Sequence, residues 1–385
     1  MIDSSSSFKR TITTILLVFL FLSGLYLSTC RPLWNDEIFS QVESVEKTSA
    51  KDMLLGKIPE GNNAPLFYLL QKIFTSLLGY EYPHPWAHEW HVYEPKGQVV
   101  LRVLSNFFMC LAFILIFLYM VRCSSSIGLG VYAIVLALSL SNVWLHWIEA
   151  RPYALWFLLT AIQTILLARI SKEKMMDGRS WWRLGVVHYL LGLTISFSAV
   201  QIAIALFFLW LGKHGSFKKF FWTGLLPIAI AAYYFSQGPK YPFWFAGSPI
   251  LLIYPNFHKE WLIMLNVYGI YLVLSRKIKS SENFSALYLM VYAMLAFAFL
   301  GIFKIFDKGG PQGFLIPSRY FFFLVPPAII WIALISWDML RKITSRWLRA
   351  NVMIVLLALL TVHLFRTAGH LYSLAIFWRL EDFLR

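Results

Sequence analysis

The stretch "TITTILLVFLFLSGLYLSTCRPLWNDEIFS", Thr11 to Ser40, decides the class of this protein. It opens with an apolar run of roughly twenty residues, the length that crosses a bilayer as a helix. The run is followed by an acidic pair, Asp36 and Glu37, which marks a membrane surface because charges are costly in lipid. We interpret residues 11–29 as a retained helix, since no small-residue cleavage site of a signal peptide follows.

The composition of the whole chain is that of an integral membrane protein. Of its 385 residues, 59% are hydrophobic and only 14% are charged, which is too apolar for a soluble domain of this length. The formal net charge is +15. The Lys and Arg residues are nevertheless spread over short segments between apolar runs, so no nucleic-acid-binding face is expected.

The apolar runs predict an all-α, polytopic membrane protein with about eleven transmembrane helices plus interfacial helices. The runs are 11–29, 99–121, 128–147, 152–170, 184–197, 199–212, 220–236, 260–275, 284–304, 319–338 and 350–366. The positive-inside rule assigns the connections rich in Lys and Arg to the cytoplasm. The segments on the outer side are then residues 30–98, 148–151, 237–259, 305–318 and the carboxyl tail.

Two features of this pattern need a different interpretation. The segment "APLFYLLQKIFTSLLGY", residues 64–80, is near the short limit for a span and contains Gln71 and Lys72. As a span it would reverse the side of every later loop, so we expect a helix in the outer interface. The runs 184–197 and 199–212 are also short and predict a hairpin whose tip stops below the outer surface.

Polar residues of the outer connections converge on one membrane face, which is typical of a functional site. Asp36 and Glu37 are the candidates for catalysis, although such a pair could simply begin a surface helix. As a catalyst, one carboxylate would be the general base that deprotonates an acceptor hydroxyl. Adjacent helical side chains point about 100° apart, so the second acid would support the first rather than share its proton.

Cationic and aromatic residues near the outer helix ends are candidates for binding a substrate phosphate. An arginine fork binds phosphate oxygens bidentately and stays charged, although an arginine at a helix end often only reaches lipid headgroups. A local ion pair between Glu149 and Arg151 is a further alternative. The candidates for donor-phosphate or substrate binding are Arg31, Glu149, Arg151, Tyr153, Lys240, His258, Arg319 and Tyr320.

No metal site is assigned from the sequence. His84, His88 and His91 have a metal-like spacing, but they lie in a loop that prolines interrupt, and a structural zinc site needs ligands on a defined scaffold. No cofactor is therefore assigned, and the sequence leaves open whether a divalent cation binds.

Five motifs follow one another along the predicted outer face. They are "RPLWNDE" (31–37), "NNAPLFYLL" (62–70), "LRVLSNFF" (101–108), "IEARPYALWFLL" (148–159) and "SRYFFFLVP" (318–326). In this order they resemble the GT-C superfamily of membrane glycosyltransferases, in particular bacterial members related to protein O-mannosyltransferases and lipid A aminoarabinose transferases. The sequence departs from that family where Asn63-Ala64-Pro65 replaces His-Pro-Pro and where Ser196-Phe197-Ser198 stands in place of the histidine often found in the middle hairpin.

The resemblance implies one GT-C-like integral membrane domain over residues 1–385, with 30–98 as the first outer loop and no separate soluble domain. The implied enzyme is a hexosyl or pentosyl glycosyltransferase in the inner cell membrane, with its active site on the outer, periplasmic side. It would move a sugar from a polyprenyl-phosphate donor to a glycan, lipid or protein acceptor, usually with inversion.

The same resemblance, together with the chemistry of the residues, suggests their roles. Asp36 would be the base and Glu37 would hold the first loop. Arg319, assisted by Arg151 or Lys240, would stabilise the charge of the departing phosphate.

A polytopic transporter or flippase of lipid-linked sugars is the main alternative. Transporters usually place ionisable residues near mid-membrane and often contain repeated halves. In this sequence the acids cluster at predicted outer helix ends, and no internal repeat is evident. We therefore favour an enzyme.

Overall fold

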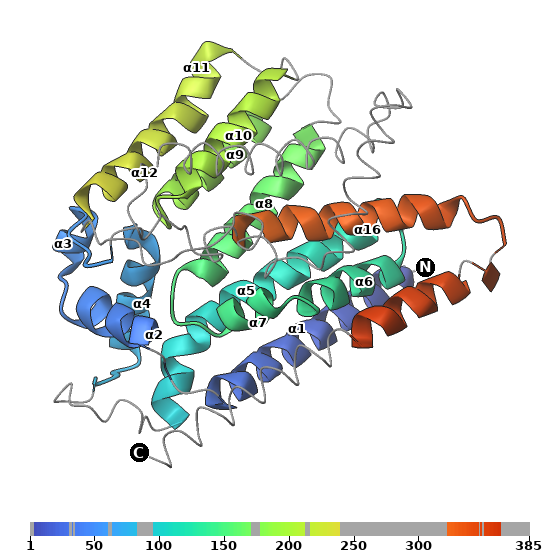
Figure 1. Ribbon diagram of the computed structural model, residues 1–385, viewed down its shortest axis with the longest axis horizontal. Coiled ribbons are helices and arrows are strands. Elements are labelled where there is room, and N and C mark those ends of the chain that lie inside the picture. The colour runs from blue at the N-terminus through green and yellow to red at the C-terminus, as the bar shows by residue number, and fades with distance from the viewer. Residues whose placement is uncertain are drawn as a thin grey trace, which may run out of the picture. The chain divides into compact units, whose positions relative to one another are not determined.

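In the computed structural model of the chain, the described residues form helices joined by turns and short connections (Figure 1). The described residues are 4–30, 33, 35–60, 64–82, 95–170, 178–211, 216–238, 322–345, 347–348 and 350–362. No strand occurs within these ranges, so the all-α prediction is confirmed for this part of the chain.

The chain divides into two compact units, residues 1–60, 65–158 and 347–385 in the first and residues 61–64 and 159–346 in the second. The described helices that begin in the first unit are α1 (Ser4–Cys30), α2 (Asn35–Phe39), the π-helix η1 (Ser40–Glu46), α3 (Ala50–Leu54), α4 (Pro65–Leu77), α5 (Pro95–Ser124), α6 (Ile127–Leu138), α7 (Ser141–Trp147) and α8 (Tyr153–Ile170), together with an unlabelled helix at Ala350–Val362. The second unit contains most of α8 and then α9 (Gly178–Gly192), α10 (Ser198–Leu211), α11 (Phe217–Phe220), the π-helix η3 (Phe221–Leu225), α12 (Leu226–Gln237) and α16 (Val325–Arg341). That the whole chain is one domain stays a prediction.

Four described helices are long and apolar enough to cross a membrane, namely Arg10–Cys30, Gly97–Ser124, Tyr153–Ile170 and Phe322–Arg341. They match the predicted spans 11–29, 99–121, 152–170 and 319–338. Two shorter apolar helices, Ser198–Phe207 and Ala350–Val362, fall within other predicted spans. The predicted spans 260–275 and 284–304 lie outside the described residues, so the total of about eleven stays a prediction.

The predicted span 128–147 is not one straight helix. α6 ends at Leu138, α7 begins at Ser141, and the two helices are bent by 83°. Leu140 between them has extended backbone, with ψ at 122°. The indole of Trp144 donates to the carbonyl of Leu138, which satisfies an acceptor that the helix end would leave open. This region is either a broken span or a re-entrant loop.

α4 covers most of the predicted interfacial helix. Gln71 is buried, and its amide donates to the carbonyl of Leu101 on α5 at 2.9 Å. The ammonium of Lys72 donates to three carbonyls at or just after the end of η1, over 2.7 to 3.1 Å. The opposite face exposes Ile73 and Leu77. α4 therefore docks through these polar contacts and through buried aromatic residues, and it leaves an apolar face outward, which suits a helix in a membrane interface.

α1 packs on α5 through a close approach at Gly24. A Cβ at this position would lie 1.9 Å from Oδ1 of Asn106, and small residues of this kind let helices in membranes approach closely. Asn106 is itself fixed, because its Nδ2 donates to the carbonyl of Phe21 at 2.9 Å and its Oδ1 accepts from Nε1 of Trp147 at 2.7 Å.

A chain of buried polar side chains joins four helical segments of the second unit. Gln201 on α10 donates to Oγ1 of Thr160 at 3.0 Å and to Oε1 of Gln163 at 2.7 Å, both on α8. Gln163 bonds Nε2 of His188 on α9 at 3.0 Å, and Nδ1 of His188 bonds the carbonyl of Thr223 in η3. Interhelical hydrogen bonds of this kind supplement van der Waals packing in apolar bundles.

Replacing Gly24 with alanine should lower the stability of the protein. The added methyl group would push Asn106 away from its two hydrogen bonds, and overpacking of this kind costs about 1–3 kcal/mol. The measurement is the melting temperature of the purified protein in detergent. Gly178→Ala is the matched control, because nothing lies within 4 Å of a Cβ at that position. Equal melting temperatures for the two variants would contradict the close approach of α1 and α5.

Candidate functional site

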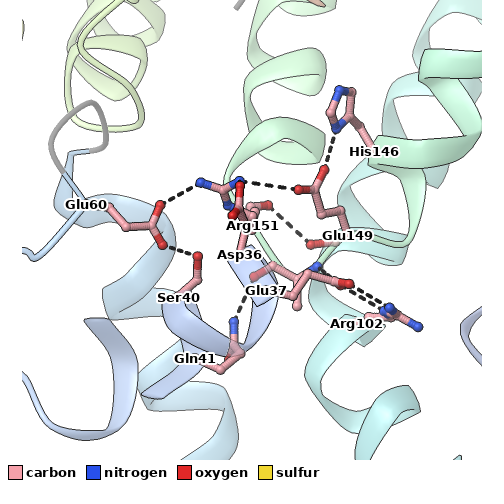
Figure 2. Close-up of polar contacts among 11 residues, drawn as sticks. Asp36, Glu37, Ser40, Gln41, Glu60, Arg102, His146, Glu149 and Arg151 are labelled. Atoms are coloured by element: carbon pink, nitrogen blue, oxygen red, sulfur yellow. Dashed lines mark hydrogen bonds and ion pairs between the residues drawn. The ribbon is translucent and has the colours of Figure 1, made fainter. Parts of the chain in front are cut away.

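The acidic motif lies on a short helix that continues into a π-helix. Asp36 and Glu37 occupy the first turn of α2, where the helix dipole favours acids. The i→i+5 bonding of the following η1 widens the turn. Ser40 and Gln41 follow Asp36 and Glu37 by four residues, so the four side chains lie on one side of this helical segment, as Figure 2 shows.

Glu37 forms a fully buried ion pair with Arg102 of α5. Nε and Nη2 of Arg102 donate to the two carboxylate oxygens at 2.9 and 2.7 Å, and both side chains are 0% exposed. Nη1 of Arg102 donates to the carbonyl of Ser28 near the end of α1 at 3.0 Å. Oε1 of Glu37 also accepts from the backbone N–H of Ala150, at 2.8 Å. The pair thus ties together α1, α2, α5 and the connection between α7 and α8.

Arg151 holds three further contacts with carboxylates. Its Nη1 lies 3.0 Å from Oδ2 of Asp36 and 3.5 Å from Oε1 of Glu149, and its Nη2 lies 2.8 Å from Oε2 of Glu60. Burial alone would lower the pKa of Arg151, but electrostatic interactions with Glu60, with the phenolic oxygen of Tyr153 and with Glu149 raise that pKa well above its ordinary value. Arg151 therefore stays charged. We refer to Asp36, Glu37, Glu60 and Glu149, with Arg102 and Arg151, as the acidic cluster.

Glu60 reaches the acidic cluster from the connection between α3 and α4. Besides Arg151, its carboxylate bonds the hydroxyl of Ser40 and interacts with Tyr68 of α4, whose pKa is raised by burial and by the negative charge of Glu60. A tyrosine in this setting stays neutral and can donate to the carboxylate. Glu60 thereby links η1, α4 and the α7–α8 connection.

His146 on α7 supports the other side of Arg151. Its Nδ1 bonds a carboxylate oxygen of Glu149, and because a carboxylate only accepts, the proton lies on Nδ1. The imidazole ring is 4.6 Å from the ring of Tyr153, centroid to centroid, and the guanidinium carbon of Arg151 is 5.3 Å from the same tyrosine ring. Gln41 completes the connection by donating to the carbonyl of Ala150 at 2.8 Å.

Asp36 differs from the other carboxylates of the cluster in its accessibility. Its side chain is 37% exposed, whereas the side chains of Glu37, Glu60 and Glu149 are at most 7% exposed. A group that exchanges protons with a substrate must be reachable and positioned. Asp36 is both accessible to a substrate and held in position by Arg151.

The acidic cluster carries more negative than positive charge. Its four carboxylates face two guanidinium groups, and Arg151 alone contacts three of those carboxylates. A phosphate bound by Arg151 would have to compete with them. Holding Asp36 is therefore a stronger role for Arg151 than assisting a leaving phosphate.

The structure brings together five of the predicted site residues: Asp36, Glu37, Glu149, Arg151 and Tyr153. The predicted local ion pair of Glu149 with Arg151 is present at 3.5 Å. The other predicted residues lie outside the described part of the chain, and they are Arg31, Lys240, His258, Arg319, Tyr320 and the histidines 84, 88 and 91. Within the described ranges, no three His, Cys, Asp or Glu side chains are grouped to hold a metal ion.

Sequence reasoning missed Arg102, Glu60 and His146. Arg102 carried a usable signal, since it is a charged residue inside the apolar run 99–121 and such residues are rare without a buried partner. Glu60 and His146 carried none, because each looks like an ordinary polar residue of a connection or helix end.

Replacing Glu60 with glutamine should destabilise the protein markedly. It would leave Arg151 less well paired in a buried site, and breaking a buried ion pair costs about 3–5 kcal/mol. The measurement is thermal unfolding in detergent. Glu43→Gln is the matched control, because Glu43 pairs with Lys47 on the surface of η1, where the side chains are 35% and 50% exposed and such pairs contribute about 0–1 kcal/mol. Similar melting temperatures for both variants would contradict the role of Glu60.

No protein-family model matches the sequence, and no curated protein matches it significantly. The resemblance to GT-C glycosyltransferases thus rests on the five short motifs and on the chemistry of their residues.

Proposed function

We propose that this chain is a membrane glycosyltransferase of the GT-C type, which moves a sugar from a polyprenyl-phosphate donor to an acceptor at the outer face of the membrane. The observation that carries the proposal is the accessible carboxylate of Asp36, held at 3.0 Å from Arg151 among buried acids. Segments 36–41, 60, 102 and 146–153 contribute to the acidic cluster, and three of the five motifs supply residues to it. Motifs that are distant in the chain yet share one cluster support a common site.

In the proposed reaction, Asp36 accepts the proton of an acceptor hydroxyl while the hydroxyl oxygen attacks the anomeric carbon of the sugar. The bond from that carbon to the phosphate oxygen breaks, and the carrier phosphate leaves with the electron pair. Inversion follows from this single displacement. Arg319, with Lys240, would stabilise the phosphate charge in place of a general acid. If the acceptor is itself a phosphate, no base is needed and Asp36 would position it.

A transporter or flippase of lipid-linked sugars remains the alternative proposal. It would be expected to hold its ionisable groups near mid-membrane. Asp36 and Glu37 begin the short helix α2, and Glu60 and Glu149 lie in connections between helices. Acids at such positions favour an enzyme acting at the membrane surface.

The proposed side of the membrane can be tested by cysteine labelling. In a variant whose three native cysteines are replaced by alanine, Ala50→Cys should react with a membrane-impermeant maleimide in intact cells, whereas Ser216→Cys should react only after the cells are opened. Both positions are exposed in the structure, and the positive-inside rule assigns them to opposite sides. Labelling of Ser216→Cys in intact cells, with Ala50→Cys protected, would place the acidic cluster in the cytoplasm and end the proposal.

Asp36→Asn should abolish sugar transfer, because an amide cannot accept the proton of the acceptor. A strain lacking this chain would be compared with its parent by mass spectrometry of envelope glycans and glycolipids. The wild-type gene should restore the missing product, and the Asp36→Asn gene should not, at equal protein level. Glu43→Gln, which removes a carboxylate from the same helical segment, should restore it fully. Restored product with Asp36→Asn removes Asp36 from the catalytic role.

A further inference from the structure

The ion pair of Glu37 and Arg102 is not explained by stability alone. Taking two charges out of water is costly, and apolar side chains of similar volume often stabilise a fold equally well. A bidentate pair does provide something that apolar packing lacks. The planar guanidinium meets both carboxylate oxygens in one relative orientation, so it fixes the rotation of the helix that carries the carboxylate.

The orientation of α2 matters because Asp36 immediately precedes Glu37. The side chain of Asp36 is 37% exposed, so packing constrains it less than its buried neighbours. Its direction depends on Arg151, which lies 3.0 Å from its carboxylate, and on the backbone of α2. That backbone is fixed through Glu37, which accepts from Arg102 on α5 and from the N–H of Ala150 on another segment.

Arg102 is also held in place by a contact that does not involve Glu37. Its Nη1 donates to the carbonyl of Ser28 at 3.0 Å, and its side chain is 0% exposed. The arginine therefore transmits the position of α1 and α5 to α2, and Figure 2 shows its contact with Glu37.

We propose that Arg102 is a positioning residue, which fixes the rotation of α2 through Glu37 and so directs the carboxylate of Asp36 toward the acceptor. This inference rests on the proposed function, in which Asp36 is the base. Arg102 makes no contact with substrate in this proposal, and its effect on the reaction passes entirely through Glu37.

The test uses a double variant, Glu37→Gln with Arg102→Met, together with Arg102→Lys. The double variant removes both buried charges and keeps an acceptor for the N–H of Ala150, so it should melt close to the wild-type temperature. Its rate of restoring the missing envelope product, per amount of folded protein, should fall by about a hundredfold, the size of effect expected from a misplacement of about 1 Å. Arg102→Lys keeps the positive charge but loses the fork, and its rate should fall by at least about tenfold.

The outcomes separate this inference from the proposed function. A stable double variant with wild-type rate means that the pair is merely structural and overturns the inference. If the double variant does not fold, a wild-type rate in Arg102→Lys overturns it instead. If the Asp36→Asn variant is active, Asp36 is not the base and Arg102 has no positioning role. If the Asp36→Asn variant is inactive but the double variant is active, only the positioning role of Arg102 is rejected. Glu43→Gln serves as the control for loss of a carboxylate on η1.

Discussion

A guanidinium group that is buried away from water is stable only when it is paired with carboxylates. This requirement determines which segments of the first unit contact one another. Arg102 sits in a helix apolar enough to cross a membrane, and Arg151 is buried beside the start of the next such helix. Each arginine pairs with a carboxylate from a distant segment of the chain, Arg102 with Glu37 and Arg151 with Glu60. The short segments between α1 and α5 bury apolar side chains such as Val42, Met53 and Phe67, and the charged contacts add fixed directions to this packing.

The sequence predicted the features that follow from composition over a long window. The apolar run 11–29, the acidic pair after it and the helix at 152–170 are all features of this kind, and the described part of the chain contains each of them as expected. The break between Leu138 and Ser141 was missed because the run 128–147 has neither glycine nor proline at the bend, and the serines at 139 and 141 did not interrupt its apolar character enough to end a predicted span. The structure shows why the bend is tolerated: the indole of Trp144 donates to the carbonyl of Leu138 at the end of α6.

The candidate site was predicted only where the residue types were unusual for their position. Asp36 and Arg151 stand at the ends of apolar runs and were recognised there. Glu60 was not recognised, because its role depends on an ion pair with Arg151, which lies 91 positions away in the sequence. Pairing of this range depends on how helices pack, and neither periodicity nor charge spacing records it. Arg102 differs, because a charged residue inside an apolar run already indicates a buried partner, although the sequence does not show which residue that partner is.

The polar chain of the second unit has a consequence for the chemistry of its histidine. Nδ1 of His188 must donate to the carbonyl of Thr223, and Nε2 then receives the amide hydrogen of Gln163. Both nitrogens are therefore occupied, and the neutral tautomer is fixed. An imidazole in this state can neither ligate a transition metal nor carry protons along the helices. Histidine-directed acylating reagents that inactivate the protein would accordingly be reporting on another imidazole.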